Sequence, residues 1–110
     1  MPKHAPLAAV QDLEQLTGLF RLLSDKTRLN ILMLLAAGER NVSSLCDELG
    51  LPQPTVSHHL GLLRMNNVIG NRRSGKQVFY TLNGRVHVDG GGGLEVGMDH
   101  VAVRITPAHA

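Results

Sequence analysis

The chain has 110 residues, of which 43% are hydrophobic and 18% charged, a size and composition that predict one folded globular domain. The longest apolar run, 31–37, is far shorter than the roughly 20 residues that cross a bilayer, and residues 1–10 lack the apolar segment of a secretory signal. Neither a membrane span nor a signal is therefore expected. The single cysteine, Cys46, excludes an internal disulfide and is compatible with a reducing cytoplasm.

The net charge is only +2, but the charges are unevenly placed. No acidic residue lies between Glu48 and Asp89, whereas five basic residues lie there: Arg64, Arg72, Arg73, Lys76 and Arg85. A one-sign patch in a nearly neutral chain is typical of a protein that binds a polyanion. An ordinary solvated surface explains the charge alone equally well.

Four helices are predicted in the first two thirds of the chain. Apolar residues recur every three or four positions from Leu7 to Leu23, which indicates a first helix. A second helix follows Ser24 or Asp25 as the N-cap and ends at Gly38, with a core of Leu29, Ile31, Leu32 and Leu35. A third, short helix runs from the cap Asn41 to Gly50, with Val42, Leu45 and Leu49 on one face.

The fourth helix is expected over residues 53–67, after a short turn that contains Pro52. Proline blocks continuation of the third helix but is tolerated in the first turn of the next one. Two helices joined by so short a turn indicate a helix-turn-helix. Two β-prone runs, 68–73 and 77–82, follow with Gly75 between them and predict a basic hairpin, so the expected unit is a winged helix.

The last third of the chain alternates apolar and polar residues, which predicts strands rather than a helix. The strands are expected in 85–88, 94–96 and 100–105, separated by a glycine-rich turn that includes Gly90–Gly93. The predicted fold class is thus mainly α with a β-hairpin, a winged helix-turn-helix with a C-terminal β-strand extension. Residues 1–84 are expected to form the winged-helix unit, and residues 85–110 an extension of the same domain.

The two faces of the fourth helix differ. On a helical wheel Val56, Leu60 and Leu63 turn into the core, whereas His58, Gly61 and Met65 face away. Ser57 and Thr55 flank the outward face, and His59 is expected to be a partly buried structural histidine. A helix that presents polar residues near its N-terminus can read base edges in the major groove, and Gly61 would allow a close approach.

Other chemistries fit these residues poorly. Ser57 and His58 are adjacent, so their side chains diverge by about 100° on a helix and cannot pair as nucleophile and base. An enzyme is therefore not expected. Readers of single-stranded RNA stack bases on exposed aromatic residues, and this chain has only Phe20, Phe79 and Tyr80. Double-stranded DNA is the favoured partner.

Three motifs in order resemble one known family. They are SDKTRLNIL at residues 24–32, QPTVSHHL at 53–60, and RSGKQVFY at 73–80. Leu23–Leu82 is similar to the arsenic-repressor (ArsR/SmtB) family of bacterial winged-helix repressors. The resemblance implies a homodimer that binds a palindromic operator and releases it when an effector binds. The predicted DNA-binding residues are Gln53, Thr55, Ser57, His58, Arg64, Arg72, Arg73, Lys76 and Gln77.

The chain departs from the metal-sensing members of that family. Where the resemblance implies a Cys-x-Cys pair, the matching positions are Asn41 and Ser43, and the usual final helix is replaced by the predicted strands. Cys46 is more simply a core residue, and the spacing of His87, Asp89, Asp99, His100 and His109 matches no known metal motif. No metal and no cofactor are predicted, and the effector is unknown. Two alternatives stay open: a winged-helix module that binds proteins, and a metal or redox sensor that uses Cys46 or the C-terminal histidines.

The predicted strands also change the expected dimer. The family resemblance implies pairing through the first and last helices, and the last helix is missing here. The first helix is therefore expected to supply most of the interface, with the C-terminal strands adding to it. An apolar strand such as 100–105 needs a partner within or between chains, because an open strand edge promotes aggregation.

Overall fold

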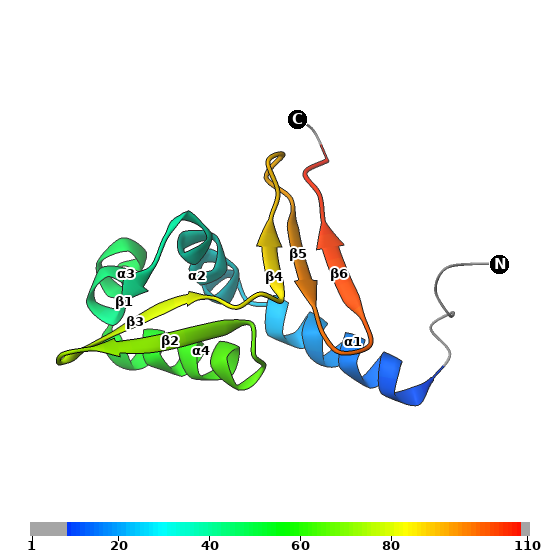
Figure 1. Ribbon diagram of the computed structural model, residues 1–110, viewed down its shortest axis with the longest axis horizontal. Helices are drawn as coiled ribbons and strands as arrows, with labels where there is room; N and C mark the ends of the chain where they lie inside the picture. Colours follow the sequence, from blue (N-terminus) through cyan, green and yellow to red (C-terminus); the bar gives the residue numbers. More distant parts are fainter. Residues whose placement is uncertain (1–8, 109–110) are drawn as a thin grey trace.

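The computed structural model describes residues 9–108. The helices of this part of the chain are α1 (Val10–Leu23), α2 (Lys26–Ala37), α3 (Val42–Leu49) and α4 (Gln53–Met65). The strands are β1 (Arg40–Asn41), β2 (Ile69–Ser74), β3 (Gln77–Leu82), β4 (Val86–Val88), β5 (Leu94–Gly97) and β6 (Ala102–Ile105). In Figure 1 the helices α2, α3 and α4 surround the first sheet, and the second sheet stands on α1 at the other end of the molecule. The predicted winged helix-turn-helix is confirmed.

Local signals in the sequence set the helix ends. The carboxylate of Asp25 accepts a 3.0 Å hydrogen bond from the backbone N–H of Arg28 and so caps α2. The same N–H is the main cause of a lowered pKa of Asp25. Asn41 caps α3 through a 2.8 Å bond from the N–H of Ser44, and Gly50 ends that helix at a φ of 67°, in the left-handed region that favours glycine. The predicted cap of α3 is confirmed, and of the two candidates for α2 the structure selects Asp25.

Some predicted boundaries were wrong. The first helix begins at Val10, and Leu7, where it was expected to start, lies outside the described residues. The fourth helix ends at Met65 rather than at residue 67, because Asn67 adopts a left-handed φ of 60° and turns the chain into the wing. The first wing strand runs over 69–74 rather than 68–73.

The wing is a three-stranded antiparallel sheet in the order β1-β3-β2. A two-residue turn, Gly75 and Lys76, joins β2 to β3, with Gly75 at a φ of 61°. The first central position of a hairpin turn favours glycine when its φ is positive. The short strand β1 pairs with β3, Arg40 opposite Tyr80, and this strand was not predicted from the sequence.

The C-terminal strands form a second antiparallel sheet in the order β4-β5-β6, as the alternating pattern predicts. Val86, Leu94 and Val96 from this sheet are buried in the same hydrophobic cluster as the helices. The connection between β5 and β6 contacts α1 directly, because the backbone N–H of His100 donates a 2.9 Å hydrogen bond to Oε1 of Gln15. The extension therefore packs on the first helix.

Candidate nucleic-acid interface

The inner face of α4 fixes this helix on the core. Val56 and Leu63 are fully buried and Leu60 is 1% exposed, as the helical wheel predicts. They pack in one cluster with residues of α2 and α3, including Ile31, Leu32 and Leu45. Burial of large aliphatic side chains is the main driving force for such packing. The outer face of α4 is therefore presented by a rigidly anchored helix.

The outer face of α4 carries the predicted reading residues. Gln53, Thr55, Ser57 and His58 are all exposed, as are Gly61, Arg64 and Met65 further along the helix. A Cβ added to Gly61 would meet no atom within 4 Å beyond its chain neighbours and the nearby backbone of its own helix, so the glycine leaves open space on this face. The predicted reading residues are thus all accessible to solvent.

His59 points to the other side of the helix. Its side chain is 12% exposed, and its Nδ1 lies 3.2 Å from a guanidinium nitrogen of Arg28. This confirms a partly buried, hydrogen-bonded histidine. The His58 and His59 rings meet edge to face at a centroid distance of 5.5 Å. His58 is nevertheless exposed to solvent, whereas His59 is mostly buried.

The wing residues divide into free and paired side chains. Arg73 and Lys76 are exposed, and Lys76 lies in the turn at the tip. Arg72 instead forms a two-pronged ion pair with Glu39, at 2.8 and 2.6 Å, and lies 4.9 Å from the centre of the Phe79 ring. Gln77 is exposed, and its Oε1 accepts a 3.1 Å bond from Nδ2 of Asn41.

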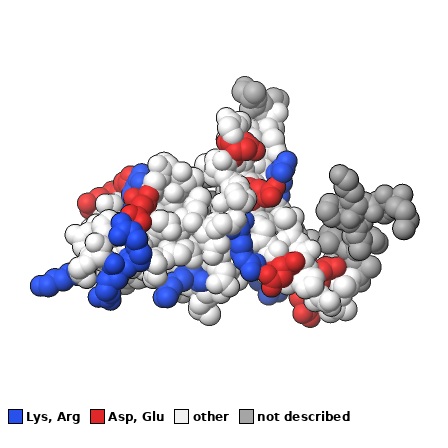
Figure 2. Space-filling view, in the orientation of Figure 1, with Lys and Arg blue, Asp and Glu red and all other residues white. Residues whose placement is uncertain are grey.

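The ion pair of Arg72 with Glu39 places an acidic residue beside the basic residues of the wing. Hydrogen bonds from Arg72 lower the pKa of Glu39, and the same contact raises the pKa of Arg72. The pair therefore stays ionised at neutral pH. Residues 49–88 contain no acid, yet Glu39 supplies one in space. In Figure 2 basic side chains line the lower edge over the wing and α4, with acidic ones beside them and over α1.

A groove of about 640 Å³ runs between α4 and β2 on this side of the molecule. Its lining residues are Gly61, Arg64, Met65, Asn67, Ile69, Gly70, Asn71 and Asn83. The side-chain amides of Asn71 and Asn83 can donate to and accept from a nucleic acid backbone. No signal in the sequence distinguishes these two residues, because isolated asparagines next to turns are common.

The residues proposed for metal binding do not come together. Within residues 9–108, no group of three or more His, Cys, Asp or Glu could hold a metal ion. Cys46 is half-buried against the core, Asp99 pairs with Arg85 at 2.9 Å, and His100 lies 3.6 Å from Asp12. His109 is outside the described residues. Nor does any helix in the described part of the chain have the length and apolar character to cross a membrane.

Comparison with known proteins gives one family. Residues 25–69 match the model of the bacterial regulatory proteins of the arsR family. The chain is 44% identical over 63 residues to the regulator KmtR of Mycobacterium tuberculosis, covering 57% of this chain and 48% of KmtR. It is 34% identical over 74 residues to the transcriptional repressor SdpR of Bacillus subtilis, covering 67% of this chain and 82% of SdpR. The match to KmtR thus spans about half of that protein.

A solved structure agrees with the family match. The homodimeric winged helix-turn-helix DNA-binding domain from Mycobacterium bovis superposes with a TM-score of 0.63 at 30% identity, over 73% of this chain and 76% of that one. The family model covers α2 to the start of the wing, which includes the whole outward face of α4. This chain therefore belongs to the arsR family of bacterial regulatory proteins.

Proposed function

We propose that this protein is a transcriptional repressor that binds a palindromic operator in double-stranded DNA as a homodimer. The observation that supports this proposal best is the exposed outer face of α4, with Thr55, Ser57 and His58, on a helix whose inner face is buried. SdpR is a transcriptional repressor, and the domain from Mycobacterium bovis is a homodimer that binds DNA, which supports the proposal. Operators lie in the bacterial cytoplasm, where this protein would act.

Two groups of residues would divide the work. Gln53, Thr55, Ser57 and His58, in the N-terminal half of α4, would contact base edges in the major groove. Arg64, Arg73 and Lys76 would contact phosphates, which positions the protein but carries no sequence information. Arg72 and Gln77 are expected to contribute less, because each already has a partner within the protein.

The proposal is tested by selecting duplexes from a random pool with the purified protein, alongside the DNA upstream of its own gene. We expect a defined site with two inverted half-sites. His58→Ala should retain binding to random duplex but lose preference for the selected site, measured by fluorescence anisotropy. A wild-type protein that binds no duplex at low salt would support instead the winged helix as a protein-binding module.

The salt dependence of binding should separate Arg73 from Arg72. If the dimer neutralises about six phosphates, log K against log salt should have a slope of about −5. Arg73→Ala is expected to flatten it by about one unit for each phosphate that the variant leaves unneutralised. Glu39→Gln should make the slope steeper and tighten binding to every duplex, because it releases the Arg72 guanidinium from its carboxylate partner. Equal slopes for the wild type, Arg73→Ala and Glu39→Gln would contradict this assignment of roles.

Helix α1 offers an apolar stripe for dimerisation. Val10, Leu13 and Phe20 lie on one side of this helix and are 69%, 50% and 54% exposed. Such a stripe is unfavourable in water unless another surface covers it. A second copy of the chain is the expected cover, with the C-terminal sheet beside α1 extending the contact.

Phe20→Glu is therefore expected to convert the dimer to a monomer, since it would place a charge in an apolar interface. Light scattering during size-exclusion chromatography should give twice the chain mass of 11.9 kDa for the wild type and the single mass for the variant. Met33→Glu is the matched control, because Met33 is similarly exposed, at 43%, but lies on α2. A Phe20→Glu protein that stays dimeric would exclude α1 as the main interface.

A further inference from the structure

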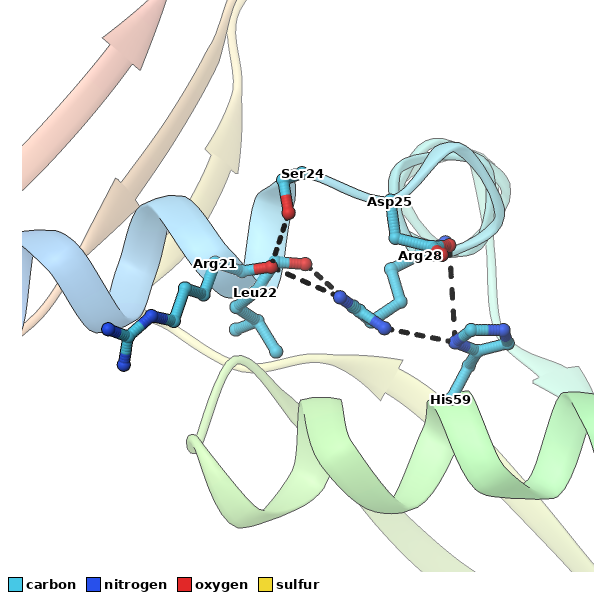
Figure 3. Close-up of polar contacts among 6 residues, drawn as sticks. All are labelled: Arg21, Leu22, Ser24, Asp25, Arg28 and His59. Atoms are coloured by element: carbon cyan, nitrogen blue, oxygen red, sulfur yellow. Dashed lines mark hydrogen bonds and ion pairs between the residues drawn. The ribbon is translucent and has the colours of Figure 1, made fainter.

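One arginine connects three helices of the protein. Arg28, in the first turn of α2, donates from Nε to the carbonyl of Leu22 at 2.6 Å and from Nη2 to the carbonyl of Arg21 at 3.1 Å. These carbonyls belong to the last turn of α1, where the regular helical N–H partners run out, and the carbonyl of Arg21 also accepts a 2.8 Å bond from the hydroxyl of Ser24. The remaining guanidinium nitrogen, Nη1, lies 3.2 Å from Nδ1 of His59 on α4 (Figure 3).

The chemistry of Arg28 and His59 decides which of them donates the hydrogen bond between Nη1 and Nδ1. A guanidinium has only donors, so Nδ1 of His59 must accept, and the neutral ring carries its proton on Nε2. Asp25 lies 4.0 Å from the same nitrogen, beyond hydrogen-bond distance, and its oxygen accepts from the backbone N–H of Arg28 instead. With the ring 12% exposed, the Arg28–His59 bond is partly shielded from competing water.

The position of His59 makes this bond relevant to DNA reading. It directly follows Ser57 and His58, so it holds the inner side of the turn whose outer side carries the reading residues. The apolar contacts of α4 anchor the helix on the core, but the hydrophobic effect has no directional preference of its own. A hydrogen bond weakens steeply when its angle changes, so it selects one rotation.

We infer that Arg28 and His59 are positioning residues that lock α4 to the end of α1 and so set the distance between the two reading helices of the dimer. The inference rests on the proposed function, in which α1 lies at the dimer interface. Dimers that bind DNA through a helix-turn-helix read two half-sites at a fixed separation along the DNA duplex. The rotation of α4 relative to α1 would thus be translated into a required operator spacing.

The test uses three variants of the full chain. His59→Leu removes the acceptor with little change in size, and His59→Asn restores an acceptor oxygen on Cγ, where histidine has Nδ1. Arg28→Lys keeps a positive charge, but its donors all lie on one nitrogen and cannot reach the three acceptors that three separate guanidinium nitrogens reach. It provides a second disruption if His59→Leu folds poorly, which is checked by thermal unfolding.

The first readout needs no DNA. A spin label is placed on α4 at Met65→Cys, which is 79% exposed, in a chain that also carries Cys46→Ala. Electron–electron dipolar spectroscopy then measures the distance between the two labels of a dimer. We expect one narrow distribution for the wild-type sequence and His59→Asn, and a broadened or shifted one for His59→Leu and Arg28→Lys. Identical narrow distributions in all four proteins, or the absence of an interchain signal, would overturn the inference.

The second readout uses the selected duplex with its spacer changed by one or two base pairs. The wild type and His59→Asn should favour one spacing by about tenfold, which corresponds to about 1.4 kcal/mol. His59→Leu should discriminate less than about threefold. An unchanged spacing preference in a folded His59→Leu protein would overturn the inference. If the wild type binds no duplex, the proposed function fails, while the distance measurement still decides whether Arg28 and His59 position α4.

Discussion

Replacing Gly61 by leucine is expected to weaken binding to the selected duplex by about tenfold or more, or about 1.4 kcal/mol. Gly61 lies on the outer face of α4, between the reading residues and Arg64, where the absent side chain permits close approach to DNA. Leucine would fill this space and hold the helix away from base edges, whose contacts each contribute about 1–3 kcal/mol of discrimination. Fluorescence anisotropy titration measures the change.

The same substitution should not harm the fold. A Cβ at Gly61 meets no atom within 4 Å beyond its chain neighbours and the nearby backbone of its own helix, and glycine inside a helix is about 0.8–1.0 kcal/mol less favourable than alanine. Gly61→Leu is therefore expected to unfold at the wild-type temperature or slightly above it. Weak DNA binding in a stable protein identifies a contact surface. Wild-type affinity in the leucine variant would show that this face of α4 does not approach DNA.

Leu60→Ala is expected to lower the free energy of unfolding by about 3 kcal/mol. Leu60 is 1% exposed and lies in the cluster that anchors α4, so truncation leaves a cavity between α4 and its neighbours. The total free energy of unfolding of a single domain of this size is only about 5–15 kcal/mol. Urea denaturation followed by circular dichroism measures the loss.

Met65→Ala is the control for that experiment. It truncates another apolar residue of α4, but one that is 79% exposed, and should change the free energy of unfolding by less than about 0.5 kcal/mol. Equal effects of the two substitutions would mean that α4 is not anchored through Leu60. The difference between the variants therefore tests the buried and exposed faces of the same helix.

Short-range signals explain why most of the fold could be predicted. Asp25, Asn41 and Gly50 each mark a helix end through contacts within a few residues, so the sequence carries the information locally. The apolar period of α4 also separated Val56 and Leu60 from the outward residues. The alternation of apolar and polar residues within 85–105 distinguished strands from a helix in the same way.

Contacts between distant segments could not be predicted. The strand β1 has only two residues and exists through its pairing with Tyr80 and Phe79, far along the chain. Glu39 and Arg72 are separated by 33 positions, so the pattern of charge in the sequence left their ion pair hidden. His59 was expected to be partly buried, but its partner Arg28, 31 positions earlier, follows only from the packing of α2 on α4.

The central claim is that the outer face of α4 lies in the major groove of a DNA duplex. Protection of guanine N7 from dimethyl sulfate tests it most directly, because N7 is exposed in the major groove. We expect the wild-type protein to protect guanines in two half-sites about one helical turn, or roughly 10 base pairs, apart. His58→Ala should weaken that protection. Full methylation of every guanine on duplex that is demonstrably bound would contradict the account.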